Sequence, residues 1–177
     1  MKLLKNKISG IRRTRKFMKC KIKSWPKLLF SLFITQAAGG IGSIFTMPKI
    51  DTWYETLNKP FFQPPNWLFG PVWTILFLLM GISLYLVWTG SWHHKLKEEA
   101  MLIFIAQLVL NVFWSIAFFG FQNTALAFLE ILVLWTSILF TILYFAKLNK
   151  TAAYLLVPYI FWVSFASVLN FAIWYLN

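Results

Sequence analysis

Charge is scarce in this chain. Charged residues make up 12% of its 177 residues, whereas hydrophobic residues make up 59%. Ordinary soluble domains contain about 25% charged residues, and so few charges could not cover the surface of a soluble fold of this length. The excess of apolar residues also excludes intrinsic disorder. The composition therefore indicates an integral membrane protein, and the length suits a single domain.

Cysteine and histidine are almost absent. Cys20 is the only cysteine, which excludes an intramolecular disulfide and a metal cluster built on cysteines. The two histidines, His93 and His94, fall in a loop between apolar runs. The usual metal sites and the Ser-His-Asp and Cys-His catalytic sets are therefore not expected within the apolar runs. Since no glycine-rich phosphate loop is present either, we expect the protein to require neither a metal nor a cofactor.

Acidic residues are missing from the first 27 positions, which hold eleven of the seventeen lysines and arginines. The rest of the chain has six basic and five acidic residues, so the net charge of +12 belongs to a basic tail, residues 1–27. This concentration argues against a nucleic-acid-binding domain. A basic tail beside an apolar run favours contact with anionic membrane lipid, at about 1 kcal/mol for each basic residue near the surface.

Five apolar runs are long enough to cross a membrane. A spanning helix needs roughly 20 apolar residues, and the runs lack the alternation of barrel strands. We therefore predict an all-α integral membrane protein, with a five-transmembrane-helix bundle formed by residues 28–177. A kink is expected in the last helix at Pro158. The predicted helices cover about residues 28–47, 67–89, 100–120, 124–146 and 153–174.

Loop charge predicts the orientation of the bundle. A cytoplasmic N-terminus places fifteen basic residues on the cytoplasmic side and only Lys49 and Lys59 outside. We therefore expect a multi-pass protein, most simply in a bacterial cell membrane, with its C-terminus outside. Two other interpretations of the tail stay open, because a basic segment before an apolar run is also typical of a signal peptide or a mitochondrial address. Met18 is an alternative start.

The first loop, residues 48–66, is long and rich in proline and aromatic residues. Loops of this length often bind or cover ligands, and proline removes backbone freedom. The loop is therefore predicted to be a stiff lid over the outer mouth of the bundle, with an interfacial aromatic belt as the alternative.

Polar and aromatic side chains gather in the outer half of the membrane. At 1.5 Å per residue, Trp73 lies about 10 Å below the outer surface, and Asn111 and Trp114 lie about 13 and 9 Å below it. Trp162 and Ala166 are one turn apart on the same helical face. Together these residues predict a pocket for a large flat hydrophobic molecule, with core packing as the alternative for the tryptophans.

Glu130 is the only charged residue inside a predicted span. Its depth of about 10 Å makes it a candidate ligand contact, and hydrogen bonding between helices is the alternative role. In the first span, Gly39, Gly40, Gly42 and Ser43 allow a neighbouring backbone or a ligand to approach closely.

Three blocks of residues match a known family. The first block includes Trp53-Tyr54, Lys59-Pro60, Pro64-Pro65 and Gly70-Pro71-Val72-Trp73. The second includes Leu110-Asn111, Trp114-Ser115 and Phe118-Phe119-Gly120, and the third Pro158-Tyr159, Trp162, Phe165-Ala166 and Leu169-Asn170. In these blocks the chain resembles the TspO/MBR family of tryptophan-rich sensory proteins, which includes the mitochondrial translocator protein, or peripheral benzodiazepine receptor.

The resemblance implies a five-helix bundle, often a homodimer, with a pocket under the first loop that binds porphyrins such as protoporphyrin IX and haem. The resemblance also implies a role in porphyrin breakdown, as in bacterial members, for the tryptophans Trp73 and Trp162. Trp114 and Glu130 are added to the ligand contacts that the resemblance implies, because they lie at a similar depth in the membrane. The candidate ligand-binding residues are therefore Tyr54, Trp73, Asn111, Trp114, Glu130, Trp162 and Ala166.

Two positions depart from the family pattern. Tyr175 is followed by Leu176 and Asn177, where cholesterol-binding members carry a basic residue, so sterol binding is not implied. Leu126 stands where animal members have another pocket tryptophan, so the affinity for drugs is expected to differ.

Three classes of function follow. The favoured one is a membrane receptor for porphyrins and other flat hydrophobic ligands, with a sensory, transport or stress-regulatory role. The second is an enzyme that degrades porphyrin with light and oxygen, using Trp73 and Trp162 as redox partners. The third is a structural or regulatory membrane protein whose pocket is incidental, and transport of a sterol or small molecule is a further alternative to the first.

Overall fold

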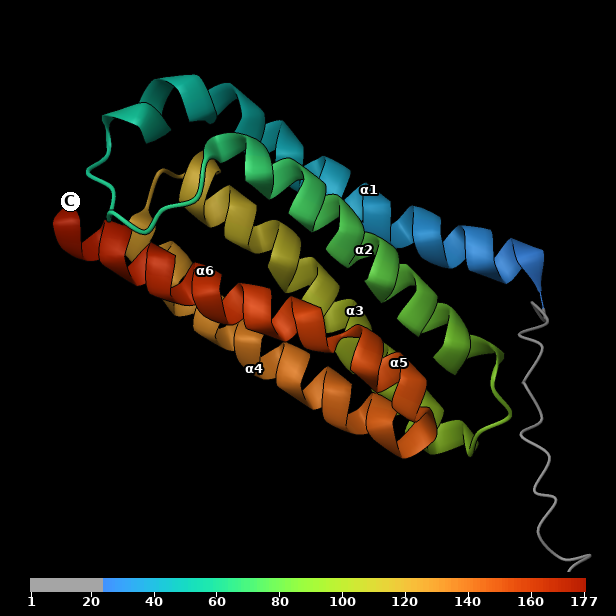
Figure 1. Cartoon of the computed structure of the whole chain (residues 1–177). Helices are drawn as coiled ribbons and strands as arrows, with labels where there is room; N and C mark the ends of the chain where they lie inside the picture. The colour runs from blue at the N-terminus through green and yellow to red at the C-terminus, as the bar shows by residue number, and fades with distance from the viewer. Residues whose placement is uncertain (1–23) are drawn as a thin grey trace, which may run out of the picture.

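The computed structural model describes residues 24–177, so most of the predicted basic tail lies outside the described residues. Within this part of the chain all regular secondary structure is helical. Five helical spans are long and apolar enough to cross a membrane, and they lie side by side in one bundle (Figure 1). The prediction of an all-α membrane protein with five spanning helices is confirmed.

The first span is longer than its apolar run predicts. Helix α1 covers Trp25–Lys49, passes through Pro48 and continues as a π-helical turn, Ile50–Tyr54. The prediction of a loop over residues 48–66 is therefore wrong for its first part. The irregular connection between α1 and α2 comprises residues 57–65.

Aromatic packing explains why the chain stays helical beyond Pro48. A proline inside a helix removes one backbone donor, and a hydrogen bond contributes about 1 kcal/mol. The Trp53 and Tyr54 rings each pack against both Phe118 and Phe119, with centroids 5.6–6.3 Å apart. Aromatic pairs contribute about 0.5–1.5 kcal/mol each, so these four contacts outweigh the lost bond.

The next three helices follow their apolar runs. Helix α2 covers Asn66–Thr89, α3 covers His94–Ser115 with a π-helical turn at Ile116–Gly120, and α4 covers Thr124–Leu148. Helix α3 begins before its predicted start because its first turns are polar, and hydropathy marks only the part in hydrocarbon. Asn123 caps α4, since its side chain accepts a hydrogen bond from a backbone N–H at 2.9 Å.

The fifth span is broken next to Pro158, as the sequence predicts. Helix α5 covers Lys150–Leu155, α6 covers Val157–Leu176, and Leu156 separates them with φ −90° and ψ −8°. Proline has no N–H and its ring clashes with the preceding turn, so the helix restarts with the proline in its first turn, where no donor is needed. The expected kink is confirmed.

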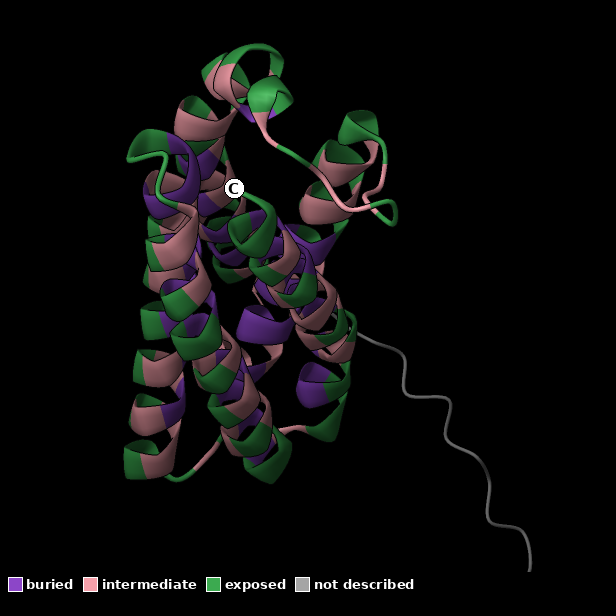
Figure 2. Cartoon of the chain, turned by 90° about the vertical axis from the view of Figure 1, so that its left-hand side faces the viewer, coloured by how far each residue is buried: buried purple, intermediate pink, exposed green. Residues whose placement is uncertain are grey.

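Helices α1 and α2 approach each other closely at two glycines. A Cβ atom at Gly81 would lie 2.8 Å from Thr35 Oγ1 and 3.0 Å from Leu32 Cα, and a Cβ atom at Gly39 would lie 2.5 Å from the Phe77 ring. Small residues permit such contact between membrane helices. Figure 2 shows buried residues turned towards the interior of the bundle and exposed ones on its outside.

We expect Gly81→Ala to destabilise the bundle because the new methyl group meets backbone atoms of α1, which cannot rotate away. Overpacking of this kind costs about 1–3 kcal/mol, so the melting temperature in detergent should fall by roughly 5 °C. Gly70→Ala is the matched control, since a Cβ atom there meets nothing within 4 Å. Equal melting temperatures for the two variants would contradict the close contact.

Candidate ligand-binding cavity

A cavity of about 570 Å³ lies between α1, α2, α3 and α6, towards the end of the bundle that carries the two π-helical turns. Its volume falls within the range of about 300–1,000 Å³ that is typical of small-molecule sites. None of its lining residues, all within residues 24–177, is charged. The cavity therefore suits an uncharged or largely apolar molecular surface.

Six of the seven candidate ligand contacts line this cavity. They come from the π-helical turn after α1 and from three helices. The turn supplies Tyr54, α2 supplies Trp73, α3 supplies Asn111 and Trp114, and α6 supplies Trp162 and Ala166. Residues far apart in the sequence thus form one wall, as their similar predicted depths indicate.

The tryptophans of the wall are held by other rings. Trp73 lies 5.5 Å from Phe77 between ring centroids, and Trp114 stacks on Phe118 at 5.2 Å. Trp162 packs against Phe69 at 5.8 Å, with the rings at 68°. Such neighbours restrict the indoles, so the wall is pre-organised to receive a flat aromatic molecule.

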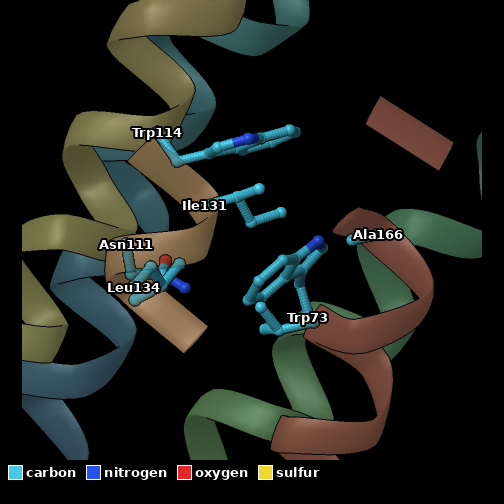
Figure 3. A pocket seen from close by; sticks show the side chains of 7 residues that line it. Trp73, Asn111, Trp114, Ile131, Leu134 and Ala166 are labelled. Atoms are coloured by element: carbon cyan, nitrogen blue, oxygen red, sulfur yellow. The ribbon is translucent and has the colours of Figure 1, made fainter. Parts of the chain in front are cut away.

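A small recess of about 10 Å³ extends the wall towards α4. Figure 3 shows Trp73, Trp114 and Ala166 around it, together with Ile131 and Leu134 of α4. Its size is about that of one water molecule. The recess is therefore too small for a ligand of its own and belongs to the wall of the larger cavity.

A buried hydrogen-bond chain holds Asn111 in place. Its Nδ2 donates to the Tyr159 hydroxyl at 2.9 Å, and this hydroxyl donates to Gln107 Oε1 at 3.0 Å. Gln107 Nε2 in turn lies 3.9 Å from the sulfur of Met80. Satisfied buried networks of this kind fix side-chain orientation, so the amide of Asn111 faces the cavity in one defined position.

Two of the wall tryptophans differ in whether the indole N–H has a hydrogen-bond partner. Trp114 Nε1 donates to Asn170 Oδ1 at 3.1 Å, and Asn170 Nδ2 donates to the Thr124 carbonyl at 2.9 Å. Trp162 Nε1 is buried and has no hydrogen-bond partner among the described residues. An unsatisfied buried donor costs free energy; because the Nε1 atom is itself buried, Trp162 lines the cavity with its other atoms.

Glu130 does not line the cavity or its recess. It is buried in α4, and neither carboxylate oxygen has a hydrogen-bond partner within residues 24–177. Its neighbour Ile131 faces the recess instead. Depth along a helix can be read from sequence, whereas a shift of one residue turns a side chain by about 100° around the axis. The expected ligand-facing position of Glu130 is therefore not found.

The connection between α1 and α2 lies against the end of α6 and supplies no lining residue from residues 57–65. The Asn177 side chain accepts a hydrogen bond from the Asn58 N–H at 2.9 Å and donates to its carbonyl at 3.0 Å. Asn58 Nδ2 donates to the Leu176 carbonyl at 3.3 Å. We call this set of bonds the Asn58–Asn177 clasp. Figure 1 shows the connection passing beside the C-terminus.

Helix α1 contributes more to the cavity than the sequence indicates. Gln36, Thr46 and Met47 line it together with the small residues around Gly40. The glycine cluster was the available signal, because it marks a place where a backbone can approach a ligand. The polar residues on either side of the glycines carried no such signal, since such residues also occur in helix packing.

The described residues hold no group of three His, Cys, Asp or Glu side chains that could bind a metal ion. His94 Nδ1 lies 3.1 Å from Glu98 Oε2, at the end of the bundle opposite the cavity. The chemistry of the cavity therefore comes from indole rings, hydroxyl and amide groups and apolar surface.

Five membrane-spanning helices with an uncharged, tryptophan-lined cavity near one end define a polytopic helical membrane protein with an internal cavity. Comparison with known proteins specifies this class further. Residues 31–176 match the model of the TspO/MBR family, and the chain belongs to that family of membrane proteins, which includes tryptophan-rich sensory and translocator proteins.

Relatives are similar over most of their length. The chain is 46% identical to the tryptophan-rich protein TspO of Archaeoglobus fulgidus over 151 residues, which cover 85% of this chain and 97% of the relative. It is 49% identical to the tryptophan-rich protein TspO of Chlorobaculum tepidum, covering 80% and 89%. The human translocator protein is 34% identical, covering 76% and 80%.

Proposed function

We propose that this protein is a membrane receptor that binds porphyrins, protoporphyrin IX or haem, and other flat hydrophobic molecules in the cavity, with a sensory, transport or stress-regulatory role. The observation that carries the proposal is the cavity of about 570 Å³ with indole rings from three helices in its wall. Relatives named tryptophan-rich sensory protein and translocator protein agree with such a role.

Stacking and burial supply the binding free energy in this proposal. The rings of Trp73, Trp114 and Trp162 present large flat surfaces to a macrocycle, and each aromatic contact adds about 0.5–1.5 kcal/mol. The amide of Asn111, which lines the cavity, supplies a polar contact that orients a ligand.

The outer end of the cavity offers a place for the acidic groups of a porphyrin. Lys59 Nζ lies 5.2 Å from the centroid of the Tyr54 ring, which lines the cavity. An ammonium group at this edge can pair with a carboxylate that leaves the cavity between α1 and α2 and stays at the membrane surface. A macrocycle with carboxylates on one side would thus lie with its apolar edge inwards.

Titration of the purified protein with protoporphyrin IX tests the proposal. In darkness we expect a saturable shift of the porphyrin Soret band together with quenching of tryptophan fluorescence. Absence of both changes at micromolar concentrations would overturn the receptor proposal and leave the third function, in which the cavity is incidental.

A second candidate function is light- and oxygen-dependent degradation of the bound porphyrin. The observation that favours it is the position of Trp73 on α2 and Trp162 on the neighbouring helix α6, both in the cavity wall. An indole in contact with the macrocycle can donate one electron to the light-excited porphyrin, which passes it to dioxygen to give superoxide. The indole radical cation then takes an electron back from the porphyrin, and the porphyrin radical cation combines with superoxide, so that dioxygen is added to the macrocycle and the indole is restored. Loss of the Soret band under illumination, faster than for free porphyrin in the same detergent, would support it.

We also propose that the bundle is a homodimer in a bacterial cell membrane with its N-terminus in the cytoplasm. Cysteine labelling tests the orientation in a Cys20→Ser background. Phe61 is 99% exposed in the α1–α2 connection, and Lys95 is exposed at the other end of the bundle. An impermeant maleimide should label Phe61→Cys in intact cells and Lys95→Cys only after lysis. The reverse pattern would contradict the orientation predicted by the loop charges.

A further inference from the structure

The exposed residues of the cavity wall all belong to two helices. Among residues 24–177 they are Gly40, Met47, Asn66, Trp67, Gly70 and Thr74, from α1 and α2. Lining residues from α3, α6 and the π-helical turns are buried or half-buried. The cavity therefore communicates with the surroundings of the bundle between α1 and α2.

Two glycines form the edges of this opening. A Cβ atom at Gly40 or at Gly70 would meet nothing within 4 Å. Towards the end of α1 that carries the π-helical turn, Met47 and Trp67 are 70% and 71% exposed and line the same opening. The edges thus carry no charge, and at the glycines they present only backbone and hydrogen.

The opening ends about halfway along the helices. Gln36 Nε2 on α1 donates to the Thr74 carbonyl on α2 at 3.1 Å. Beyond this bond the two helices are in tight contact, since a Cβ atom at Gly81 on α2 would lie 3.0 Å from Leu32 Cα on α1. The gap is therefore confined to the half of the bundle that contains the cavity.

The end of the cavity that faces water is closed. Tyr54 is 7% exposed and packs against Phe118 and Phe119. The adjoining connection is held to α6 by the Asn58–Asn177 clasp. A ligand arriving from water would have to break these contacts, whereas the α1–α2 opening requires none to be broken.

We propose that the ligand passes between the bilayer and the cavity through the α1–α2 opening, so that the protein takes a flat molecule dissolved in the hydrocarbon and not one free in water. The inference rests on the proposed function and specifies its substrate class. A planar macrocycle can pass edge-on between Gly40 and Gly70, because neither edge carries a side chain. Lipid-dissolved molecules meet edges there without any charge to desolvate.

Binding kinetics test this route. Protoporphyrin IX is mixed with the full-length protein in lipid nanodiscs, and association and dissociation rates are followed by tryptophan quenching. Because side chains at the edges obstruct passage in both directions, Gly40→Leu and Gly70→Leu should slow both association and dissociation by about tenfold or more. The two rates should fall together, so that the equilibrium dissociation constant changes less than either rate, although both glycines also line the cavity. Trp67→Ala, which widens the opening, should speed both rates.

Two control variants complete the experiment. Ile44→Trp places a large side chain on the lipid-facing side of α1, where Ile44 is 67% exposed and lines no cavity, and it should leave both rates unchanged. Asn177→Ala removes the two bonds that the Asn177 side chain makes in the clasp and should not speed association. Faster association in Asn177→Ala, unchanged rates in the glycine variants, or a loss of affinity through dissociation alone would each overturn the route. Absence of binding by the wild-type protein would instead overturn the proposed function.

Discussion

Ala166→Trp is expected to abolish measurable porphyrin binding, with a loss of affinity of about 100-fold or more. Ala166 lines both the cavity and its recess, opposite Trp114 and Asn111. A tryptophan there places an indole in the space that a macrocycle would occupy, and the surrounding rings are too closely packed to yield. The dissociation constant from dark titration with protoporphyrin IX is the measurement.

A control on the same helix separates this effect from damage to the fold. Val168 is 57% exposed on α6 and does not line the cavity, so Val168→Trp should keep wild-type affinity. Ala166→Leu adds less volume and should give an intermediate loss. Equal affinities in Ala166→Trp and Val168→Trp, with both proteins folded, would show that porphyrin does not bind in this cavity.

Trp73→Phe and Trp162→Phe are expected to slow light-dependent porphyrin loss about tenfold or more, corresponding to about 1.4 kcal/mol in the activation barrier. Phenylalanine keeps most of the ring area, so the fold and dark binding should persist. It cannot supply the oxidisable indole. The rate of Soret-band decay under fixed illumination is the measurement, compared with free porphyrin in the same detergent.

Trp174→Phe is the matched control for these variants. Trp174 lies on the same helix as Trp162, stacks on Phe128 at 5.6 Å and does not line the cavity. It should leave the decay rate unchanged. If all three variants decay like the wild type, the tryptophans have no chemical role and the protein is a receptor only. If the wild type decays no faster than free porphyrin, the second candidate function fails.

Most of the fold could be predicted from the sequence because a membrane imposes a simple rule on helix length and polarity. The five apolar runs and the break at Pro158 follow from that rule and from the missing N–H of proline. The π-helical turn that carries Tyr54 could not be predicted, because it depends on ring contacts with Phe118 and Phe119, which are distant in the sequence.

The candidate site likewise has features that the sequence predicts and features that depend on packing between helices. Trp73, Asn111 and Trp162 could be placed at similar depths by counting residues, and they line one cavity. Glu130 has the correct depth but the wrong rotation, since the rotation of α4 is set by its packing against α3 and α6 and has no local signal. The opening between α1 and α2 likewise depends on two helices that diverge in space, although its glycines are visible in the sequence.

The Asn58–Asn177 clasp also bears on how the protein is made. It joins positions 119 residues apart, and chains are synthesised from the N-terminus. The connection before α2 can therefore form the clasp only after α6, the last of the described helices, has been synthesised. The same helix supplies Trp162 and Ala166 to the cavity, so a nascent chain with four inserted helices has neither a complete cavity nor a closed end. Under the proposed function, a ligand would bind only the finished bundle and would stabilise completed molecules over partly inserted ones.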